Sequence, residues 1–328
     1  MRADLVLVTG ATGFFGGNLA RALCLRGARV RVLVRGGRKP VALDGLDYEI
    51  ADGDMVEAAS VARAVAGCRQ VYHAAASVVF WCASPRDADG VRRVNVGGTG
   101  NITQAAGEAG VERVVHVSTV DAIGLPPAGR FADETTDWAA GRIETIYAES
   151  KREAEAVALS SAVDTVVVNP AFMIGGFDPK PTSGRLLLPL LRSPVVVFPS
   201  SGGNNFVPVR DAVAGTLAAM EKGTRGERYI LGGENLTYRE LFARALSIVG
   251  RRPLLLPLGP RAAMAAGRVC EWWARAFGGE PPLTRSLARL AFTDHYYDCS
   301  KAIRELALPQ TPIDHALREA FGWLRRRA

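Results

Sequence analysis

The sequence predicts an α/β fold in which a doubly wound parallel sheet is followed by a smaller C-terminal lobe. Three observations support this prediction. Short apolar runs alternate with helical patterns through the first half of the chain, as in β-α-β units. A glycine-rich turn follows the first apolar run, at the strand-to-helix connection typical of such sheets. After Pro170 the alternation stops, and prolines and glycines crowd residues 175–184.

The expected strands of the sheet are short and rich in valine, isoleucine and leucine. They cover residues 5–8, 30–34, 48–51, 70–73, 113–118 and 165–169. The first, Leu5–Val8, is apolar throughout, which is typical of a strand buried on both faces. Helical patterns separate the runs over residues 13–27, 56–66, 88–109 and 143–160. About six parallel strands with crossover helices make a Rossmann-type sheet.

The second half of the chain mixes short strands with longer helices. We expect strands at 195–198 and 228–231, and helices at 211–221, 238–249, 260–277 and 312–325. Residues 1–170 are therefore predicted to form a dinucleotide-binding Rossmann domain, and residues 171–328 mainly a substrate-binding lobe. Segments near residues 205–232 are expected to return to the first domain.

The composition excludes several classes of protein. The formal net charge is +7, but the densest basic clusters, 35–39 and 325–327, contain no aromatic residues, which argues against nucleic-acid binding. The five cysteines are isolated and show no metal-binding spacing, so we expect no metal and a reducing, cytoplasmic environment. No run of 18 apolar residues is present to span a membrane. The first strand begins directly after residues 1–4, which leaves no room for a signal peptide.

A dinucleotide site is predicted at the glycine-rich turn. Gly10, Gly13 and Gly16 follow the spacing GxxGxxG, which allows a tight turn, a close approach of the pyrophosphate and close packing of helix on strand. The N-terminus of the following helix then offers free N–H groups to the phosphates.

Residues at the ends of the second and third strands predict which dinucleotide binds. Arg35 stands where a carboxylate would select NAD, and its guanidinium suits a 2′-phosphate, so NADP(H) is favoured over NAD(H). Asp54 is expected to bind the adenine amino group, with Met55 packed on the adenine ring.

Tyr147 and Lys151 are the predicted catalytic pair. They are four residues apart in a helical segment and therefore share one face. A free phenol has a pKa of about 10, and a nearby ammonium together with the charge of an oxidised nicotinamide is expected to lower it, so that Tyr147 exchanges a proton with a carbonyl or alcohol group. Lys151 is also expected to hold the nicotinamide ribose.

Two further positions complete the predicted catalytic set. Ser118 and Thr119 end a strand, where a hydroxyl can orient the substrate oxygen, and Thr119 is preferred. Asn95 lies inside a predicted helix. It is expected either to hold a water that relays protons to Lys151 or to be a buried structural residue.

The ordered motifs resemble those of a known superfamily. They are Thr9–Gly16, Gly53–Met55, Val71–Ala76, Asn95–Asn101, Val117–Thr119, Tyr147–Lys151, Asn169–Pro170 and Phe206–Asp211. With them, nearly the whole chain resembles the extended short-chain dehydrogenases/reductases of the NAD-dependent epimerase/dehydratase family. The chain is most similar to the dihydroflavonol-reductase and 3β-hydroxysteroid-dehydrogenase-like branch. Residues 174–183 and 229–235 are also similar to proteins labelled hopanoid-associated sugar epimerases.

The resemblance implies roles for particular residues. Thr119, where Ser is commoner, would form the catalytic triad with Tyr147 and Lys151, with Asn95 as a fourth member. Phe172 stands where nucleotide-sugar enzymes usually carry an Asn that binds the substrate's phosphate. The residues implied to line the cofactor, besides Tyr147 and Lys151, are Gly10, Thr12, Gly13, Phe14, Phe15, Gly16, Arg35, Asp54, Met55, Ala74, Ala75 and Pro170.

An apolar substrate is expected from the side chains beyond the cofactor groove, Val78, Phe80, Trp81 and Phe172. Three functions stay open: an NADP(H)-dependent carbonyl reductase or alcohol dehydrogenase, which is favoured; a sugar epimerase or dehydratase that retains NAD(H); and a non-catalytic dinucleotide-binding module. The chain is expected to be a monomer or homodimer. Residues 262–277 are amphipathic enough to touch a membrane surface, although a packed helix is favoured.

Overall fold

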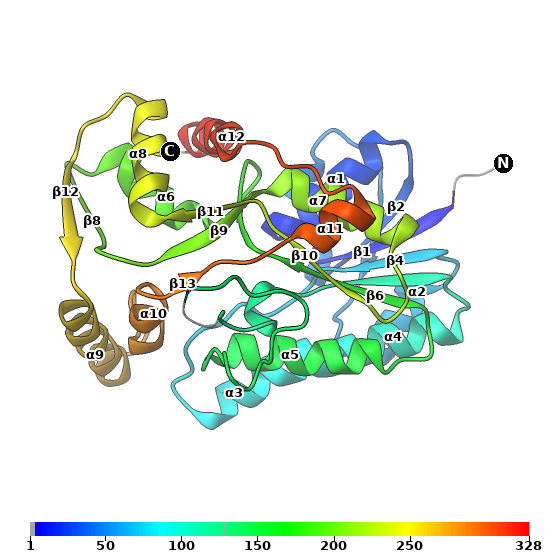
Figure 1. The fold of residues 1–328 in the computed structure, drawn as a ribbon. Helices are drawn as coiled ribbons and strands as arrows, with labels where there is room; N and C mark the ends of the chain where they lie inside the picture. Colours follow the sequence, from blue (N-terminus) through cyan, green and yellow to red (C-terminus); the bar gives the residue numbers. More distant parts are fainter. Residues whose placement is uncertain (1–3, 127–128, 328) are drawn as a thin grey trace.

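The computed structural model describes residues 4–126 and 129–327, and Figure 1 shows their arrangement. Residues 1–3, to which the expectation about a signal peptide refers, lie outside the described part. The predicted fold class is confirmed, because helices cover both faces of one large parallel sheet. Among the helices of the described residues, none combines the length and apolarity needed to cross a bilayer.

The large sheet contains seven parallel strands in the order β10-β6-β5-β4-β1-β2-β3. This is one strand more than the sequence predicts, because β10, from the C-terminal half of the chain, pairs with β6. The other six strands lie within one residue of the predicted ones. The strands are β1 (Leu5–Thr9), β2 (Arg29–Val34), β3 (Glu49–Asp52), β4 (Gln70–His73), β5 (Arg113–Val117), β6 (Thr165–Pro170) and β10 (Arg228–Leu231).

Apolar residues on both faces of the strands explain why helices cover both sides. In β1, Val6 and Val8 face one core cluster while Leu5 and Leu7 face another, since successive side chains of a strand point in opposite directions. The first cluster contains α1 (Phe14–Leu25), α7 (Val209–Lys222) and α11 (Ser300–Leu306). The second face carries α2 (Ala58–Val65), α4 (Gly98–Glu108) and α5 (Ile146–Leu159).

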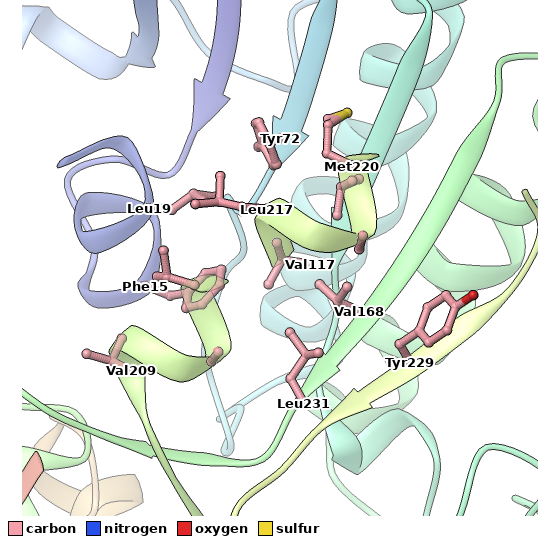
Figure 2. Packing of buried hydrophobic residues seen from close by; sticks show 14 of the residues in the cluster. Phe15, Leu19, Tyr72, Val117, Val168, Val209, Leu217, Met220, Tyr229 and Leu231 are labelled. Carbon is pink, nitrogen blue, oxygen red and sulfur yellow. The ribbon is translucent and has the colours of Figure 1, made fainter. Parts of the chain in front are cut away.

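Figure 2 shows the core between α1, α7 and the sheet. Phe15 and Leu19 of α1 pack in the same cluster as Leu217 of α7 and Val117 of β5. Because Phe15 follows directly on the glycine turn, this packing fixes the start of α1 against the sheet.

The helix predicted over residues 88–109 starts earlier and is interrupted. It begins as α3 (Pro85–Arg92), because Ser84 and Asp87 form a reciprocal capping box ahead of it. A π-helical turn, η3 (Arg93–Gly97), then joins α3 to α4 and contains Asn95. Single π-helical turns of this kind occur mostly at functional sites. Three short 3₁₀ turns lie elsewhere, η1 (Arg35–Gly37), η2 (Val41–Leu43) and η4 (Val120–Ala122).

The C-terminal lobe holds two small sheets and five helices (Figure 1). One sheet consists of β7 (Phe172–Ile174), β9 (Gly203–Pro208), β11 (Glu234–Thr237) and β13 (Asp294–His295). The other pairs β8 (Val195–Pro199) with β12 (Leu254–Leu258). The helices are α6 (Gly184–Arg192), α8 (Tyr238–Val249), α9 (Pro260–Phe277), α10 (Arg285–Leu290) and α12 (Ile313–Arg326).

Candidate active site

The turn between β1 and α1 has the geometry that its glycine spacing predicts. Gly10 has a φ of +75°, and a Cβ there would lie 2.7 Å from the backbone carbonyl of Ala74. A Cβ on Gly16 would lie 2.4 Å from the carbonyl oxygen of Gly10, so both positions require glycine. A Cβ on Gly13 would meet only the Gly10 oxygen, at 3.3 Å, and the backbone at Gly13 is therefore open to a ligand.

The first turn of α1 is suited to binding an anion. Gly13 caps this fully described helix, and its first turn contains no acidic residue. The N–H groups of Phe14 and Phe15 have no acceptor within the helix, and they lie at the positive end of its dipole. Both rings are buried, so these residues can contact a phosphate through their backbone only. Thr12 is exposed at the tip of the turn.

The loop after β4 lies beside this turn, and a buried histidine fixes it there. The Thr9 hydroxyl accepts a hydrogen bond from the Ala75 N–H at 3.0 Å and bonds to Nδ1 of His73 at 2.8 Å. Nε2 of His73 bonds to the Thr99 hydroxyl at 3.0 Å. Burial lowers the pKa of His73 to about 3, so the ring is neutral at physiological pH. His73 thus aligns the strand ends that place Ala74 and Ala75 beside the glycine turn.

Arg35 and Asp54 lie together at the ends of β2 and β3. Nη1 of Arg35 is 3.7 Å from Oδ2 of Asp54, and the arginine side chain is 75% exposed. Met55, in contrast, is buried and fills the space in front of Gly98. The structure therefore leaves Arg35 accessible to a ligand, whereas the side chain of Met55 belongs to the core.

The structure brings Tyr147 and Thr119 together. Tyr147 lies in the first turn of α5, whose N-cap Thr145 accepts a hydrogen bond from the N–H of Ala148 at 3.1 Å. Thr119 follows β5; its hydroxyl accepts a hydrogen bond from the Asp121 N–H at 3.2 Å and lies next to the Tyr147 phenol. Ser118 is buried, and among the described residues its hydroxyl has no hydrogen-bond partner. Thr119 is therefore the hydroxyl that faces Tyr147.

The surroundings of Tyr147 hold its proton tightly. Burial raises the pKa of Tyr147 well above its ordinary value and the charge of Asp121 raises it further, while the hydrogen bond with Thr119 lowers it. The lowered pKa that the sequence predicts applies to a phenol beside both Lys151 and an oxidised nicotinamide, whereas the raised pKa belongs to the protein without cofactor. Tyr147 is thus protonated at neutral pH and suited to donating a proton. Burial also raises the pKa of Asp121 to about 6.

Lys151 is buried one helical turn after Tyr147. Its Nζ donates a hydrogen bond to the carbonyl oxygen of Val117 at 2.8 Å and is 3.4 Å from Nε2 of His116. Burial lowers the pKa of Lys151 to about 8, an effect that the charge of Glu155 partly offsets. Burial also lowers the pKa of His116, which is therefore neutral at this pH. The ammonium group consequently lies at the end of β5 with its proton held less tightly than in water.

Asn95 connects the loop after β4 to α5. Its Oδ1 accepts a hydrogen bond from the Ser77 N–H at 2.7 Å, and its Nδ2 donates to the Ser77 carbonyl at 3.1 Å and to the Ser150 hydroxyl at 2.9 Å. Both of its N–H donors are thus used by protein groups, so a water bound here would have to donate to Oδ1. These contacts favour a structural role for Asn95 over the alternative that it holds a water relaying protons to Lys151.

A buried chain of polar groups holds the backbone at Thr119. Glu155 accepts a hydrogen bond from Nδ2 of Asn169 at 2.5 Å, and the same Nδ2 donates to the Thr119 carbonyl at 2.9 Å. Arg228 of β10 lies 3.5 Å from the Glu155 carboxylate. The sequence analysis does not single out Glu155. The signal that could have identified it is its position four residues after Lys151, on the same face of the helix.

The apolar residues of the predicted substrate pocket do not all lie together. Phe80 packs edge-on against Tyr147, with ring centroids 5.2 Å apart. The neighbouring Trp81 lies beneath α9, where the Arg275 guanidinium is 5.9 Å from its ring centroid. Val78 is 54% exposed. This loop therefore joins Tyr147 to the C-terminal lobe.

Phe172 lies on the other side of the predicted pocket. It begins β7, and its ring is edge-on to that of Phe206 at 5.3 Å. Pro170, two residues earlier, ends β6 opposite Leu231 of β10. Phe172 packs against the core of the C-terminal lobe, and its contact with a substrate stays a prediction.

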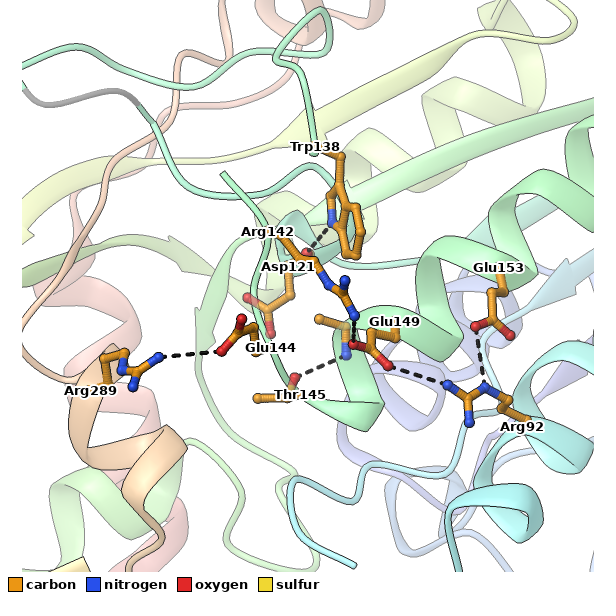
Figure 3. A network of polar contacts seen from close by, with 10 residues as sticks. Arg92, Asp121, Trp138, Arg142, Glu144, Thr145, Glu149, Glu153 and Arg289 are labelled. Atoms are coloured by element: carbon orange, nitrogen blue, oxygen red, sulfur yellow. Dashed lines mark hydrogen bonds and ion pairs between the residues drawn. The ribbon is translucent and has the colours of Figure 1, made fainter. Parts of the chain in front are cut away.

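Ion pairs anchor the end of α5 that carries Tyr147, as Figure 3 shows. Glu149 pairs with Arg142 and, at 3.3 Å, with Arg92 of α3. Glu144, just before α5, pairs with Arg289 of α10 at 3.3 Å. These contacts tie the start of α5 to both parts of the molecule, although each exposed pair contributes at most about 1 kcal/mol.

The donors around the β1–α1 turn fit a dinucleotide. The glycine turn and the first turn of α1 suit a pyrophosphate, and the exposed Arg35 suits a further phosphate. In residues 4–126 and 129–327, no group of three or more His, Cys, Asp or Glu side chains is placed to hold a metal ion.

Comparisons with known proteins agree with this geometry. The model of the NAD dependent epimerase/dehydratase family matches residues 6–232. Sterol demethylase protein B of Methylococcus capsulatus is 36% identical over 331 residues, which cover 98% of each chain. A 3β-hydroxysteroid dehydrogenase/Δ5→4-isomerase of Mycobacterium tuberculosis is 32% identical and is matched over 97% of this chain and 90% of its own.

A solved structure extends the match to three dimensions. The crystal structure of gox2253 superposes with a TM-score of 0.84 at 36% identity and covers 99% of both chains. This chain belongs to the NAD-dependent epimerase/dehydratase family, among the extended short-chain dehydrogenases/reductases, and is an NAD(P)-dependent oxidoreductase of that family.

Proposed function

We propose that this protein is an NADP(H)-dependent oxidoreductase that transfers hydride to or from a ketone, aldehyde or alcohol group of a bulky, apolar substrate. The observation that carries the proposal is the Tyr147 phenol, which lies next to the Thr119 side chain and packs edge-on against Phe80. A proton donor, an orienting hydroxyl and an apolar surface therefore meet in one place. This combination suits the reduction of a carbonyl group with an apolar body.

The residues have separate roles in this proposal. Bound NADP(H) supplies or accepts the hydride. Tyr147 gives its proton to the substrate oxygen during reduction. Thr119 donates a second hydrogen bond to the same oxygen. Lys151 holds the nicotinamide ribose, and Asn95 keeps the loop of Ser77 in register with α5.

The exposed guanidinium of Arg35 predicts a preference for NADPH over NADH. Arg35→Asp should weaken NADPH binding by about 10- to 100-fold, because a charge-assisted hydrogen bond to phosphate is replaced by repulsion. NADH has no 2′-phosphate, so its affinity in the same variant serves as the internal control and should stay within a few-fold of wild type. Titration of nucleotide fluorescence measures both constants. Equal affinity of the wild-type protein for the two nucleotides would contradict the assignment of Arg35.

An apolar substrate is supported by Phe80 beside Tyr147 and by the relatives, whose names refer to sterols and steroids. Each square ångström of apolar substrate surface that is buried contributes about 25 cal/mol. The two phosphates of a nucleotide sugar would instead lose water beside Phe80 without gaining partners from that ring.

A substrate screen tests this proposal. With NADPH, we expect turnover of steroid ketones and of other bulky apolar carbonyl compounds, and no reaction of UDP-glucose. Phe80→Ala should raise the KM of these substrates about tenfold, which corresponds to about 1.4 kcal/mol of lost binding, and should change kcat much less. Steady-state kinetics separates the two constants. A preference of the wild-type enzyme for small polar carbonyl compounds would count against the apolar site.

The second candidate is a sugar epimerase or dehydratase that retains its NAD(H), since the family includes such enzymes. Epimerisation of a UDP-sugar by the wild-type protein, with nucleotide that copurifies, would favour it. The third candidate, a non-catalytic dinucleotide-binding module, is disfavoured because the Tyr147–Thr119 contact would then have no use.

A further inference from the structure

The outer face of α9 is apolar and lacks a covering element. Its inner face, which includes Ala263, Gly267, Glu271 and Ala274, is buried, and Gly267 approaches Arg285 of α10 closely enough that a Cβ would lie 3.0 Å from its backbone. Within α9, all of which is described, the exposed side chains after Pro260 are those of eight apolar residues and three arginines. The eight are Ala262, Ala265, Ala266, Val269, Trp272, Trp273, Ala276 and Phe277.

Three aromatic rings form a cluster on this face. Trp272, Trp273 and Phe277 are 61%, 58% and 66% exposed, and the rings of Trp273 and Phe277 are 4.3 Å apart. The neighbouring strand pair adds further exposed apolar side chains at the same end of the molecule (Figure 1). These are Val195, Val197, Leu254 and Leu256. Exposed apolar residues that occur singly are normal on protein surfaces, whereas a group of large ones such as this marks an interaction surface.

The charges around this face are strongly positive. Arg261, Arg268 and Arg275 are spaced by seven residues and therefore form one row along α9, at the border of the apolar face. Residues 251–290 contain seven arginines and two glutamates, a formal net charge of +5. One of the two acids, Glu271, is buried and paired with Arg285 at 2.9 Å.

We propose that this α9 face, defined by the eight apolar residues and the arginine row, docks on the surface of an anionic lipid bilayer. Aromatic and aliphatic side chains bordered by arginines are what an interfacial helix needs: the rings enter the headgroup region while the guanidinium groups bind lipid phosphates. A second copy of this chain fits less well. In a two-fold dimer the same face would meet itself and set one arginine row against another.

The docking surface lies close to the candidate active site. Arg275, in the arginine row, lies over Trp81, whose neighbour Phe80 touches Tyr147. The protein would therefore lie on the bilayer with the loop of the active site near the lipid. The docking proposal itself does not depend on the proposed reaction.

Sedimentation with lipid vesicles tests the docking face. The full-length protein should bind vesicles of phosphatidylcholine with about 30% phosphatidylglycerol, with a blue shift of tryptophan fluorescence, and should bind pure phosphatidylcholine much less. Trp272→Ser combined with Trp273→Ser should lower the partition coefficient at least about tenfold. Arg268→Gln should lower it about fivefold on anionic vesicles, and added salt should abolish that difference.

Matched controls and the opposing outcomes complete the test. Leu25→Ser and Ile303→Ser alter exposed apolar residues far from α9 in sequence and should leave vesicle binding unchanged. The altered side chains are exposed, so the variants should fold, and circular dichroism checks this for each of them. The single variant Trp272→Ser provides a milder substitution in case the double variant does not fold. Absence of wild-type binding to anionic vesicles, or unchanged binding of the tryptophan variant, would overturn the proposal. So would sedimentation analysis showing that the tryptophan variant only converts a dimer into a monomer.

Discussion

Replacing Tyr147 with phenylalanine should lower the turnover of any accepted carbonyl substrate by about 10²–10⁴-fold, the usual effect of removing a general acid. The substitution removes only the hydroxyl group, so the ring keeps its edge-on contact with Phe80. The Thr119 hydroxyl loses its phenol neighbour but keeps the hydrogen bond from the Asp121 N–H, and α5 keeps the Thr145 cap that positions its first turn. Binding of NADPH, measured by fluorescence, should stay within a few-fold of wild type. The loss should therefore appear in kcat.

Tyr229→Phe is the matched control for this experiment. Tyr229 is a buried tyrosine of β10, and its hydroxyl accepts a hydrogen bond from the N–H of Thr224. Its loss should cost about 1 kcal/mol of stability and leave turnover unchanged. Full activity of Tyr147→Phe would show that another group supplies the proton.

Lys151→Met should lower both turnover and cofactor affinity, because we assign Lys151 two tasks. Without its ammonium group the nicotinamide ribose loses a charged donor, and we expect NADPH binding to weaken about tenfold or more. Turnover should fall at least about 10²-fold. Lys301→Met is the control, since Lys301 is a partly buried lysine that pairs with Glu227 and donates to the Arg228 carbonyl. If the Lys151 variant kept full cofactor affinity, Lys151 would not hold the nicotinamide ribose as proposed.

The same variant should change the pH dependence of stability in the protein without cofactor. The pKa of Lys151 is about 8 in the folded state and 10.5 when unperturbed. Below pH 8 both states hold the proton, and burial of the charge costs about 3 kcal/mol of folding free energy. Between these pKa values only the unfolded state holds the proton, so the stability of the wild type rises with pH.

Lys151→Met has no such proton to lose. The free energy of unfolding of the variant, relative to wild type, should therefore fall by up to about 3 kcal/mol between pH 7 and pH 10.5. Urea denaturation at a series of pH values measures this difference. The neighbouring His73 and His116 titrate far below this range, and they are present in both proteins. If the difference in free energy of unfolding between the two proteins did not vary with pH, the Lys151 ammonium group would not carry the cost of burial described above.

Local patterns were sufficient for much of the fold. Six strands of the sheet lie within one residue of their predicted ranges, because strands buried on both faces form continuous apolar runs. Gly10 and Gly16 were identified from their spacing alone, and the structure shows that a side chain at either position would strike the backbone. The placement of Tyr147 and Lys151 one turn apart in the same helix also needed only helical periodicity.

Other features depended on contacts between distant parts of the chain. The sequence predicts a strand at 228–231. Several strands could pair with it, however, and the local sequence does not tell that the partner is β6. The helix break at Asn95 follows from its hydrogen bonds to Ser77 and Ser150, which lie 18 and 55 residues away. The pKa of Tyr147 in the protein without cofactor is raised by burial of the phenol, which the sequence does not show; the lowered pKa expected beside Lys151 and an oxidised nicotinamide stays a prediction.

The sequence by itself thus determined the layers of the fold and the glycine turn, both of which depend on short-range periodicity and backbone sterics, and it supplied the catalytic set as a prediction. Tertiary structure alone decided that Thr119, rather than Ser118, faces Tyr147, and that one face of α9 is buried while its tryptophans are exposed. These outcomes depend on burial and on the direction of side chains relative to distant elements. Such quantities exist only once the chain has closed its long-range contacts, because desolvation and hydrogen bonding act between neighbours in space.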